Sequence, residues 1–254
     1  LKAEHTPSTH AMSWRLASAL VVVWCHASGA LGAIELTPQE WDRDLALSTT
    51  FRAPGENGLL CAAVAMGPPA SGVAVVGAPG ESRAYVLQRD PLDGAWAAAA
   101  ELEGPPNAST RELGVSIGLT YAETSPSAAR LQAVVGARDD VSGVAHVFGA
   151  TTTISEDPTL DSTTPTWSRE ASLRPSATPL DKFVSADAST GRWAVGGDRT
   201  IGVYEGSSWR PLWEVTVGVE AAPLGAVAIG PTALLAGAPR VNRVFAFSGN
   251  GTLA

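Results

Sequence analysis

The seven residues WAAAAEL at positions 96–102 place a tryptophan, Trp96, and an aliphatic residue, Leu102, six positions apart. The same spacing separates Trp41 from Leu47, Trp167 from Leu173, and Trp209 from Val215. An even offset places both side chains of a pair on one face of an extended strand. Four such strands in one chain predict a repeat protein.

Each tryptophan pair is followed by three further segments in a constant order. The first is a short run opened by a large apolar residue: Leu60-Cys61, Leu113-Gly114, Phe183-Val184 and Leu224-Gly225. The second ends in a triplet of mostly small residues that begins at Gly77, Gly136, Gly196 or Gly237. The third is an aromatic–aliphatic strand at 84–87, 145–148, 201–204 or 244–247. Short apolar, β-branched runs separated by Gly, Pro and Asp are typical of strands and turns.

The order of these segments predicts four copies of a four-stranded unit. A sheet with an apolar face on each side must stack on its neighbours, and small residues near a crowded axis allow backbones to approach closely. No long stretch with helical periodicity occurs after the N-terminal segment. We therefore expect an all-β fold in residues 34–254, a β-propeller of four-stranded antiparallel blades with about four blades present.

The residues that carry a family resemblance are Leu113-Gly114-Val115-Ser116-Ile117, then the run 133–138 and the strand 145–148. Gly77-Ala78-Pro79 and Gly237-Ala238-Pro239 repeat one further motif. Over about residues 38–250, the chain resembles the FG-GAP repeat family, the blades of integrin α-subunit propellers. The resemblance implies a seven-bladed ring, of which this chain holds a part. The alternative is a closed ring of four blades, in which Trp41 to Leu47 completes the blade begun at Leu224.

Many members of this family bind calcium through an acidic loop between the first and second strands of a blade. The corresponding loops here are 66–72, 120–130, 189–192 and 230–232, and they lack the clustered oxygen ligands that calcium requires. A site built from His and Cys has only His146 and Cys61 to draw on after residue 33. We expect no metal site and no cofactor.

The N-terminal region resembles a secretory signal. Residues 12–33 begin at Met12 with Arg15 as the positive residue, continue through the apolar run 16–24, and end in small residues with cleavage expected after Ala30. Residues 1–11 are interpreted as upstream sequence that the native protein does not contain. A membrane-spanning reading requires about 20 apolar residues, and Cys25-His26 interrupts the run too early; a lipid anchor on Cys25 conflicts with the bulky residues before it. We expect a secreted or cell-surface protein without direct membrane insertion.

The net charge of −8, with Lys182 the only lysine after the signal segment, argues against nucleic acid and anionic membranes as partners. An extracellular protein or glycan is the expected ligand. The two longest insertions, 120–130 and 149–166, belong to the second blade and leave from one face of the ring, so we expect them side by side. They contain the candidate binding residues Glu123, Glu156, Asp157 and Asp161. The alternative is a solvated insertion without function.

Two sequons predict N-glycosylation, at Asn107 and at Asn250. Because the pattern is short, chance occurrence is the alternative. Asn107 falls in a connection from a fourth strand to a first strand, which places it on the face opposite the insertions.

Catalysis has few candidate residues. His146 lies within a strand, where a structural role is expected, and Asp139-Asp140 lie in a turn that favours Asp. The segment 185–193 resembles the Asp-box turn of sialidases, which is itself structural. We therefore expect a non-catalytic recognition or adhesion module. The alternatives are a propeller glycoside hydrolase, or the propeller part of a larger multidomain surface protein.

Overall fold

The computed structural model describes residues 62–68, 71–90, 92–106, 111–125, 128–138, 143–153, 165–175, 185–189, 191–205, 209–218 and 224–253. The predicted signal segment, Trp41, Leu47 and the predicted cleavage site lie outside these residues. Within the described part of the chain, no helix has the length and apolar character needed to span a bilayer.

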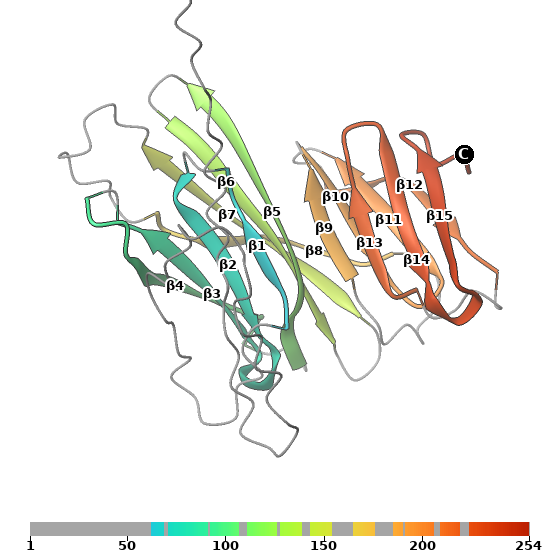
Figure 1. Cartoon of the computed structure of the whole chain (residues 1–254), viewed down its shortest axis with the longest axis horizontal. Coiled ribbons are helices and arrows are strands. Elements are labelled where there is room, and N and C mark those ends of the chain that lie inside the picture. Colours follow the sequence, from blue (N-terminus) through green and yellow to red (C-terminus); the bar gives the residue numbers. More distant parts are fainter. Residues whose placement is uncertain are drawn as a thin grey trace, which may run out of the picture.

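The strands form antiparallel sheets, here called blades 1 to 4, and each sheet follows chain order (Figure 1). Blade 1 contains β1 (Val64–Met66), β2 (Val73–Ala78), β3 (Arg83–Arg89) and β4 (Trp96–Glu103). Blade 2 contains β5 (Arg111–Ser125), β6 (Ala128–Arg138), β7 (Val144–Thr153) and β8 (Ser168–Leu173). Blade 3 contains β9 (Ser185–Ser189), β10 (Arg192–Gly196), β11 (Thr200–Glu205) and β12 (Pro211–Thr216). Blade 4 contains β13 (Ala226–Ile229), β14 (Ala233–Ala238) and β15 (Arg243–Ser248).

The blades stack in chain order, from blade 1 at one end to blade 4 at the other (Figure 1). An apolar cluster fills each junction. Val86 and Leu102 meet Leu131 and Phe148 between blades 1 and 2. Val147 and Leu173 meet Trp193 and Tyr204 between blades 2 and 3, and Val203 meets Leu234 and Phe247 between blades 3 and 4. This confirms the predicted all-β fold of about four propeller-type blades, each stabilised by its neighbours.

The three tryptophan pairs within the described residues mark the outer strands, but the prediction that both side chains of a pair share one face is wrong for them. In β4, Val86 pairs with Ala100 and Leu87 pairs with Ala98, so Ala99 is the extra residue of a β-bulge. One extra residue reverses the alternation of side chains. Leu102 therefore packs between blades 1 and 2, whereas Trp96 packs on the opposite face of blade 1.

The same bulge recurs at the same place in blades 2 and 3. The extra residues are Glu170 in β8 and Leu212 in β12, each three positions after the tryptophan. Trp167 and Trp209 lie just before these strands and pack in the junction toward the preceding blade, while Leu173 and Val215 pack away from it. The spacing of six therefore identifies a bulged outer strand whose tryptophan and aliphatic residue pack on opposite faces of the blade.

The glycines of the four triplets occupy one register position. Gly77, Gly136, Gly196 and Gly237 pair respectively with Ala84, Ala145, Ile201 and Val244 on the third strand of their blade. At the first of these positions, a Cβ on Gly77 would overlap the backbone carbonyl oxygen of Gly114 in blade 2. Gly77 therefore makes the close backbone approach that the sequence predicts.

The Ala-Pro of two triplets leads into a tight turn. Ala78 is buried, and Pro79 begins the 3-10 turn η2 (Pro79–Glu81), which ends at Ser82 with a φ of 54°. In blade 4 the corresponding turn η5 (Pro239–Val241) ends at Asn242 with a φ of 53°. Proline suits the first position of such a turn because its φ is already set.

At the outer edge of blade 4, the residues after β15 begin to pair where a fourth strand would lie. Leu253 forms an isolated antiparallel bridge with Phe247, and the backbone N–H of Ser248 donates to the carbonyl of Thr252 at 2.8 Å. The segment Trp41 to Leu47, predicted as an alternative occupant of this edge, lies outside the described residues. Closure of a four-blade ring through it stays a prediction.

Candidate functional site

The first insertion of blade 2 forms a ribbon rather than a loop, and the described start of the second insertion, residues 149–153, pairs along it. β5 is 15 residues long, and its distal half continues to pair with β6, with Thr120 opposite Gln132 and Glu123 opposite Ala129. β7 continues along β6, where Arg130 pairs with Thr151. The prediction that 120–130 is a loop is therefore wrong. The first insertion nevertheless lies beside the start of the second, as predicted, because the two belong to one extended sheet.

A polar cavity of about 420 Å³ that is open to solvent lies beside this ribbon, and we call it the ribbon site. Its lining comes from β6, β7, β8 and the residues before β8: Arg130, Gly149, Ala150, Thr151, Thr166, Ser168 and Glu170. Cavities of about 300–1,000 Å³ are the usual size of small-molecule sites. The ribbon site is thus large enough for a ligand of one or a few rings.

Glu170 is the residue that the bulge of β8 redirects. Its carboxylate accepts hydrogen bonds from Nη2 of Arg130 at 2.6 Å and from Nε2 of Gln132 at 2.7 Å. Its side chain is 19% exposed, compared with 45% for Arg130. Bulges commonly re-aim a side chain in this way. The bulge therefore places a held carboxylate at the wall of the cavity.

Gly149 provides the space that this carboxylate occupies. A Cβ at this position would overlap Oε1 of Glu170, which is the flexible end of that side chain. An alanine here would push the carboxylate aside while leaving the strand backbone in place. Position 149 therefore controls where the carboxylate of Glu170 lies.

The polar groups of the ribbon site suit an uncharged, hydrogen-bonding ligand. The charges of Arg130 and Glu170 balance each other, and Thr151, Thr166 and Ser168 add hydroxyl groups that can donate and accept. Glu170 is the single carboxylate among the described lining residues. Glycoside hydrolysis commonly uses two carboxyl groups about 5–9.5 Å apart. The described lining thus offers groups for binding and only one of the two usual carboxylates.

The predicted site residues are only partly brought together. Glu123 is exposed on the distal part of the ribbon. Asn250 is exposed in the turn after β15, where its Oδ1 accepts from the backbone N–H of Thr252 at 3.2 Å. Glu156, Asp157, Asp161 and Asn107 lie outside the described residues. The sequence analysis missed Glu170 and Arg130. Glu170 lies three positions after Trp167, which is the place of the bulge in each outer strand, and this spacing was the available signal for it.

His146 lies in the interior of blade 2, in the structural setting that the sequence predicts. Its side chain is 2% exposed, and its Nδ1 lies 2.9 Å from Oγ of Ser172 on β8. Burial, together with the charges of Arg169 and Arg174, lowers its pKa from 6.5 to about 4. The ring is therefore neutral at physiological pH.

The segment that resembles an Asp-box forms the hairpin of β9 and β10. The carboxylate of Asp187 accepts from the backbone N–H of Ile229 on β13 at 2.9 Å. This bond crosses from blade 3 to blade 4. Asp187 therefore has a structural role.

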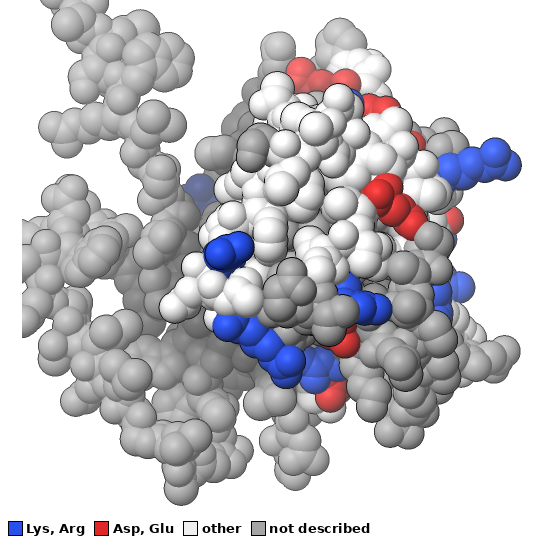
Figure 2. Space-filling model, turned by 90° about the vertical axis from the view of Figure 1, so that its right-hand side faces the viewer, with Lys and Arg blue, Asp and Glu red and all other residues white. Residues whose placement is uncertain are grey.

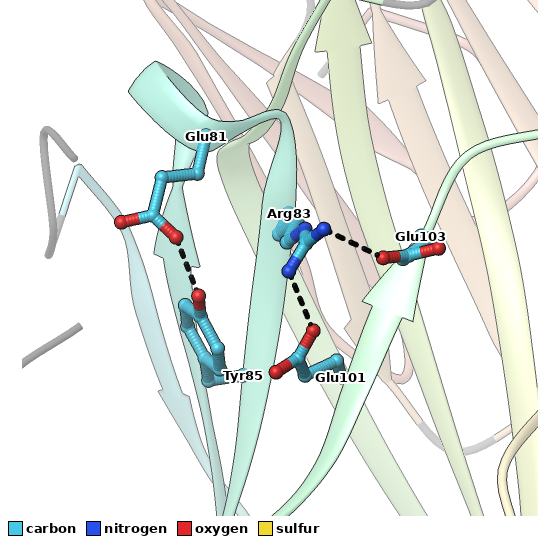
Figure 3. A network of polar contacts seen from close by, with 5 residues as sticks. All are labelled: Glu81, Arg83, Tyr85, Glu101 and Glu103. Carbon is cyan, nitrogen blue, oxygen red and sulfur yellow. Dashed lines mark hydrogen bonds and ion pairs between the residues drawn. The ribbon is translucent and has the colours of Figure 1, made fainter. Parts of the chain in front are cut away.

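A second polar cluster lies on blade 1 (Figure 3). Arg83 binds Glu101 at 2.8 Å and Glu103 at 3.1 Å, and the hydroxyl of Tyr85 donates to Glu81 at 2.5 Å. Burial, followed by the Glu81 carboxylate, raises the pKa of Tyr85 to about 12. These contacts join β3 to β4 and to the turn η2, which makes them structural. Among the described residues, no three His, Cys, Asp or Glu side chains are grouped as a metal site requires.

No protein-family model and no curated protein matches the chain. The solved structures similar to it include the Cps50 (Swd1) β-propeller domain of Myceliophteria thermophila, with 10% identity and a TM-score of 0.45. They also include Sqt1 of Saccharomyces cerevisiae, with 13% identity and a TM-score of 0.33. A third is the WD40 domain of SCAP from fission yeast, with 11% identity and a TM-score of 0.46.

These alignments cover 76%, 72% and 75% of this chain, in the same order. The chain spans 54%, 57% and 40% of the chains that it matches. Likeness at this level carries no argument about function. The strand pairing and the apolar clusters between blades define the fold instead.

Proposed function

We propose that the chain is a non-catalytic recognition module with FG-GAP-like propeller blades, exported through the secretory pathway, whose ribbon site binds a glycan. The observation that most directly supports this proposal is the position of the Glu170 carboxylate. Arg130 and Gln132 hold it at the wall of a cavity bordered by hydroxyl groups. A pre-positioned charged acceptor loses little freedom when a ligand binds. Blades of this kind serve here as the scaffold that keeps the ribbon in place.

The charge of the site favours a neutral sugar. An anionic ligand would meet Glu170 and a chain of net charge −8, and a cationic ligand would meet Arg130. Sugar hydroxyls both donate and accept hydrogen bonds, so they can pair with a carboxylate, a guanidinium or a hydroxyl group. A neutral glycan is therefore the better fit of the two extracellular ligand classes, protein and glycan.

A glycan array followed by calorimetry with the best neutral glycan tests this proposal. Glu170→Gln keeps the shape of the side chain but removes its charge, and we expect it to weaken binding by about 10- to 100-fold, because hydrogen bonds to charged groups contribute about 1.5–3 kcal/mol. The matched control is Glu101→Gln, which breaks a similar contact to an arginine on blade 1. Binding that is unchanged by Glu170→Gln would place the ligand elsewhere.

Hydrolysis of the same glycans is followed in parallel. The proposal expects no turnover, and release of a shortened glycan would overturn the non-catalytic assignment in favour of a glycoside hydrolase.

Expression from Met12 in a secreting eukaryotic host tests the export step. Recovery of the chain from the medium with a new N-terminus near residue 31 is the expected result, and retention inside the cell with residues 12–33 intact contradicts it.

A further inference from the structure

β8 separates from β7 beside the ribbon site. Within the described residues, the pairing of β8 with β7 stops where Ser168 lies opposite Gly149. β7 itself continues to Thr153 and stays paired with β6 on its other side. The outer edge of β7 therefore has no strand paired beside it at Ala150 and Thr151 in the described part of the chain.

The ribbon site lies at this gap in the sheet. Ala150 and Thr151 line the cavity from the edge of β7, and Thr166 and Ser168 line it from the segment that leads into β8. Arg130 pairs with Thr151, so the side chain of Ala150 lies on the opposite face of the sheet from that of Arg130. Ala150 is 5% exposed. It therefore borders the cavity through its backbone.

The two sides of the gap provide different hydrogen-bonding groups. The backbone groups of successive residues in a strand point alternately to its two sides, so either Ala150 or Thr151 turns its N–H and C=O toward the gap. On the other side of the gap, the hydroxyl groups of Thr166 and Ser168 can both donate and accept. A ligand between the two sides thus meets donors and acceptors in two opposite directions.

We propose that the ribbon site selects sugars with an acetamido group, an inference that rests on the glycan-binding role proposed above. The N–H and C=O of a planar trans amide point in opposite directions. One of them can bond to the edge of β7 while the other bonds to a hydroxyl across the gap. The amide is uncharged, as the balanced charges of Arg130 and Glu170 require. A single hydroxyl at the same ring position is too short to reach both sides.

An extended peptide is the competing ligand, because an unpaired strand edge can accept another strand. Among the described lining residues, however, only Ala150 and Thr151 belong to the unpaired edge of β7. The cavity of about 420 Å³ has the size of a small-molecule site. The geometry therefore favours one amide on a compact ring over a peptide that pairs along several residues.

NMR titration of the full chain tests the inference with two matched pairs of sugars. One pair is the methyl β-glycosides of N-acetylglucosamine and glucose, and the other is those of N-acetylgalactosamine and galactose. We expect at least one N-acetyl sugar to bind about tenfold or more tightly than its plain partner, because it gains two hydrogen bonds. The amide signal of Ala150 or Thr151 should shift during that titration and not with the plain sugar.

Two other amides serve as internal controls. Val147 lies on the same strand but pairs with Ala171 of β8, so its amide signal should stay in place. The end of the molecule that carries blade 4 shows a broad uncharged area with charged side chains toward its edges (Figure 2). Sugars at high concentration can adhere weakly to such a surface. The amide of Leu235, an exposed residue of β14, reports this adherence.

A double variant, Thr166→Val with Ser168→Ala, removes the hydroxyl groups across the gap. Both residues are exposed, so the fold should be retained, which circular dichroism checks. We expect the preference for the N-acetyl sugar to fall by about threefold or more. The matched control is Thr124→Val, which removes an exposed hydroxyl at the far end of the ribbon and should leave the preference unchanged.

Three outcomes contradict the inference. Equal binding of N-acetyl and plain sugars, weakened for both by Glu170→Gln, removes the selection for an acetamido group but keeps the proposed glycan site. Tighter binding of a capped pentapeptide of alternating threonine and valine assigns the edge of β7 to a peptide. Shifts at Leu235 alone, together with a negative glycan array, overturn both the inference and the proposed function.

Discussion

His146 is a buried titratable residue, and the free energy that its burial costs the folded chain depends on pH. Its Nε2 has no hydrogen-bond partner among the described residues, and Phe148 packs against the ring at a centroid distance of 6.5 Å. The neutral ring fits this environment, whereas a second proton would place a charge in an apolar interior beside two arginines. Protonation therefore opposes folding.

The expected result is a loss of stability on acidification. The pKa of His146 is lowered from 6.5 to about 4 in the folded chain, so the unfolded chain binds the proton at a higher pH. As the pH falls from about 6.5 to about 4, the free energy of unfolding decreases by up to about 3 kcal/mol from this residue. Urea unfolding across this range should show a shallower decrease for His146→Gln than for the wild type. Identical pH dependence of the two proteins contradicts the prediction.

At the scale of elements, the second strand of each blade carries the contact surface of the repeat. The triplet glycine lies at or near the end of this strand, at a position that faces the next blade in blades 1 to 3. In blade 1 that glycine approaches the backbone of Gly114, whose φ of +100° also favours glycine. In blade 4 a methyl group on the corresponding Gly237 would make only ordinary van der Waals contact, because the nearest atom lies 3.8 Å from the Cβ position. The triplet glycine therefore packs tightly against the next blade in blade 1, whereas in blade 4 it leaves room for a side chain.

Gly77→Ala and Gly237→Ala form a matched pair that separates these two situations. Gly77→Ala must push blades 1 and 2 apart, and overpacking of this kind costs about 1–3 kcal/mol. Gly237→Ala meets no obstacle and should leave stability unchanged or raise it by up to about 1 kcal/mol. Thermal and urea unfolding measure both. Equal effects of the two substitutions would show that the close approach to Gly114 contributes nothing.

For the whole molecule, side chains on the inner strands join one blade to the next. Oγ of Ser116 accepts from the backbone N–H of Ala186 at 3.0 Å between blades 2 and 3, and Asp187 accepts from Ile229 between blades 3 and 4. Each apolar cluster between blades joins two blades that are consecutive in the chain. Stability is then close to a sum of blade and junction contributions, and the end blades open first.

Asp187→Ala should loosen blade 4 selectively. The backbone N–H of Ile229 would lose its acceptor, at a cost of about 1–3 kcal/mol, whereas Asp187→Asn keeps an acceptor oxygen and should cost less. Hydrogen exchange measures this effect. Relative to the wild type, Asp187→Ala should raise the exchange rates of the amides of β13 to β15 more than those of blade 1. Uniformly faster exchange across all blades would show that the stack unfolds as one unit.

The repeat could be predicted from the sequence because its determinants are local. Apolar runs such as Val73 to Val76 favour strands, Gly and Pro end them, and their order along the chain marks the blades. The burial of His146 follows from the same local reasoning, because the residue lies inside an apolar strand.

The faces of the side chains were decided only by the tertiary structure. Whether Trp96 and Leu102 share a face depends on the register of β4 against β3, where the unpaired Ala99 reverses the alternation. The ribbon site likewise needs Arg130 and Glu170, 40 positions apart, to meet across β7, and Gly149 to leave room between them. Strand propensity depends on neighbouring residues, whereas register and bulges depend on hydrogen bonds to a strand that is distant in the chain.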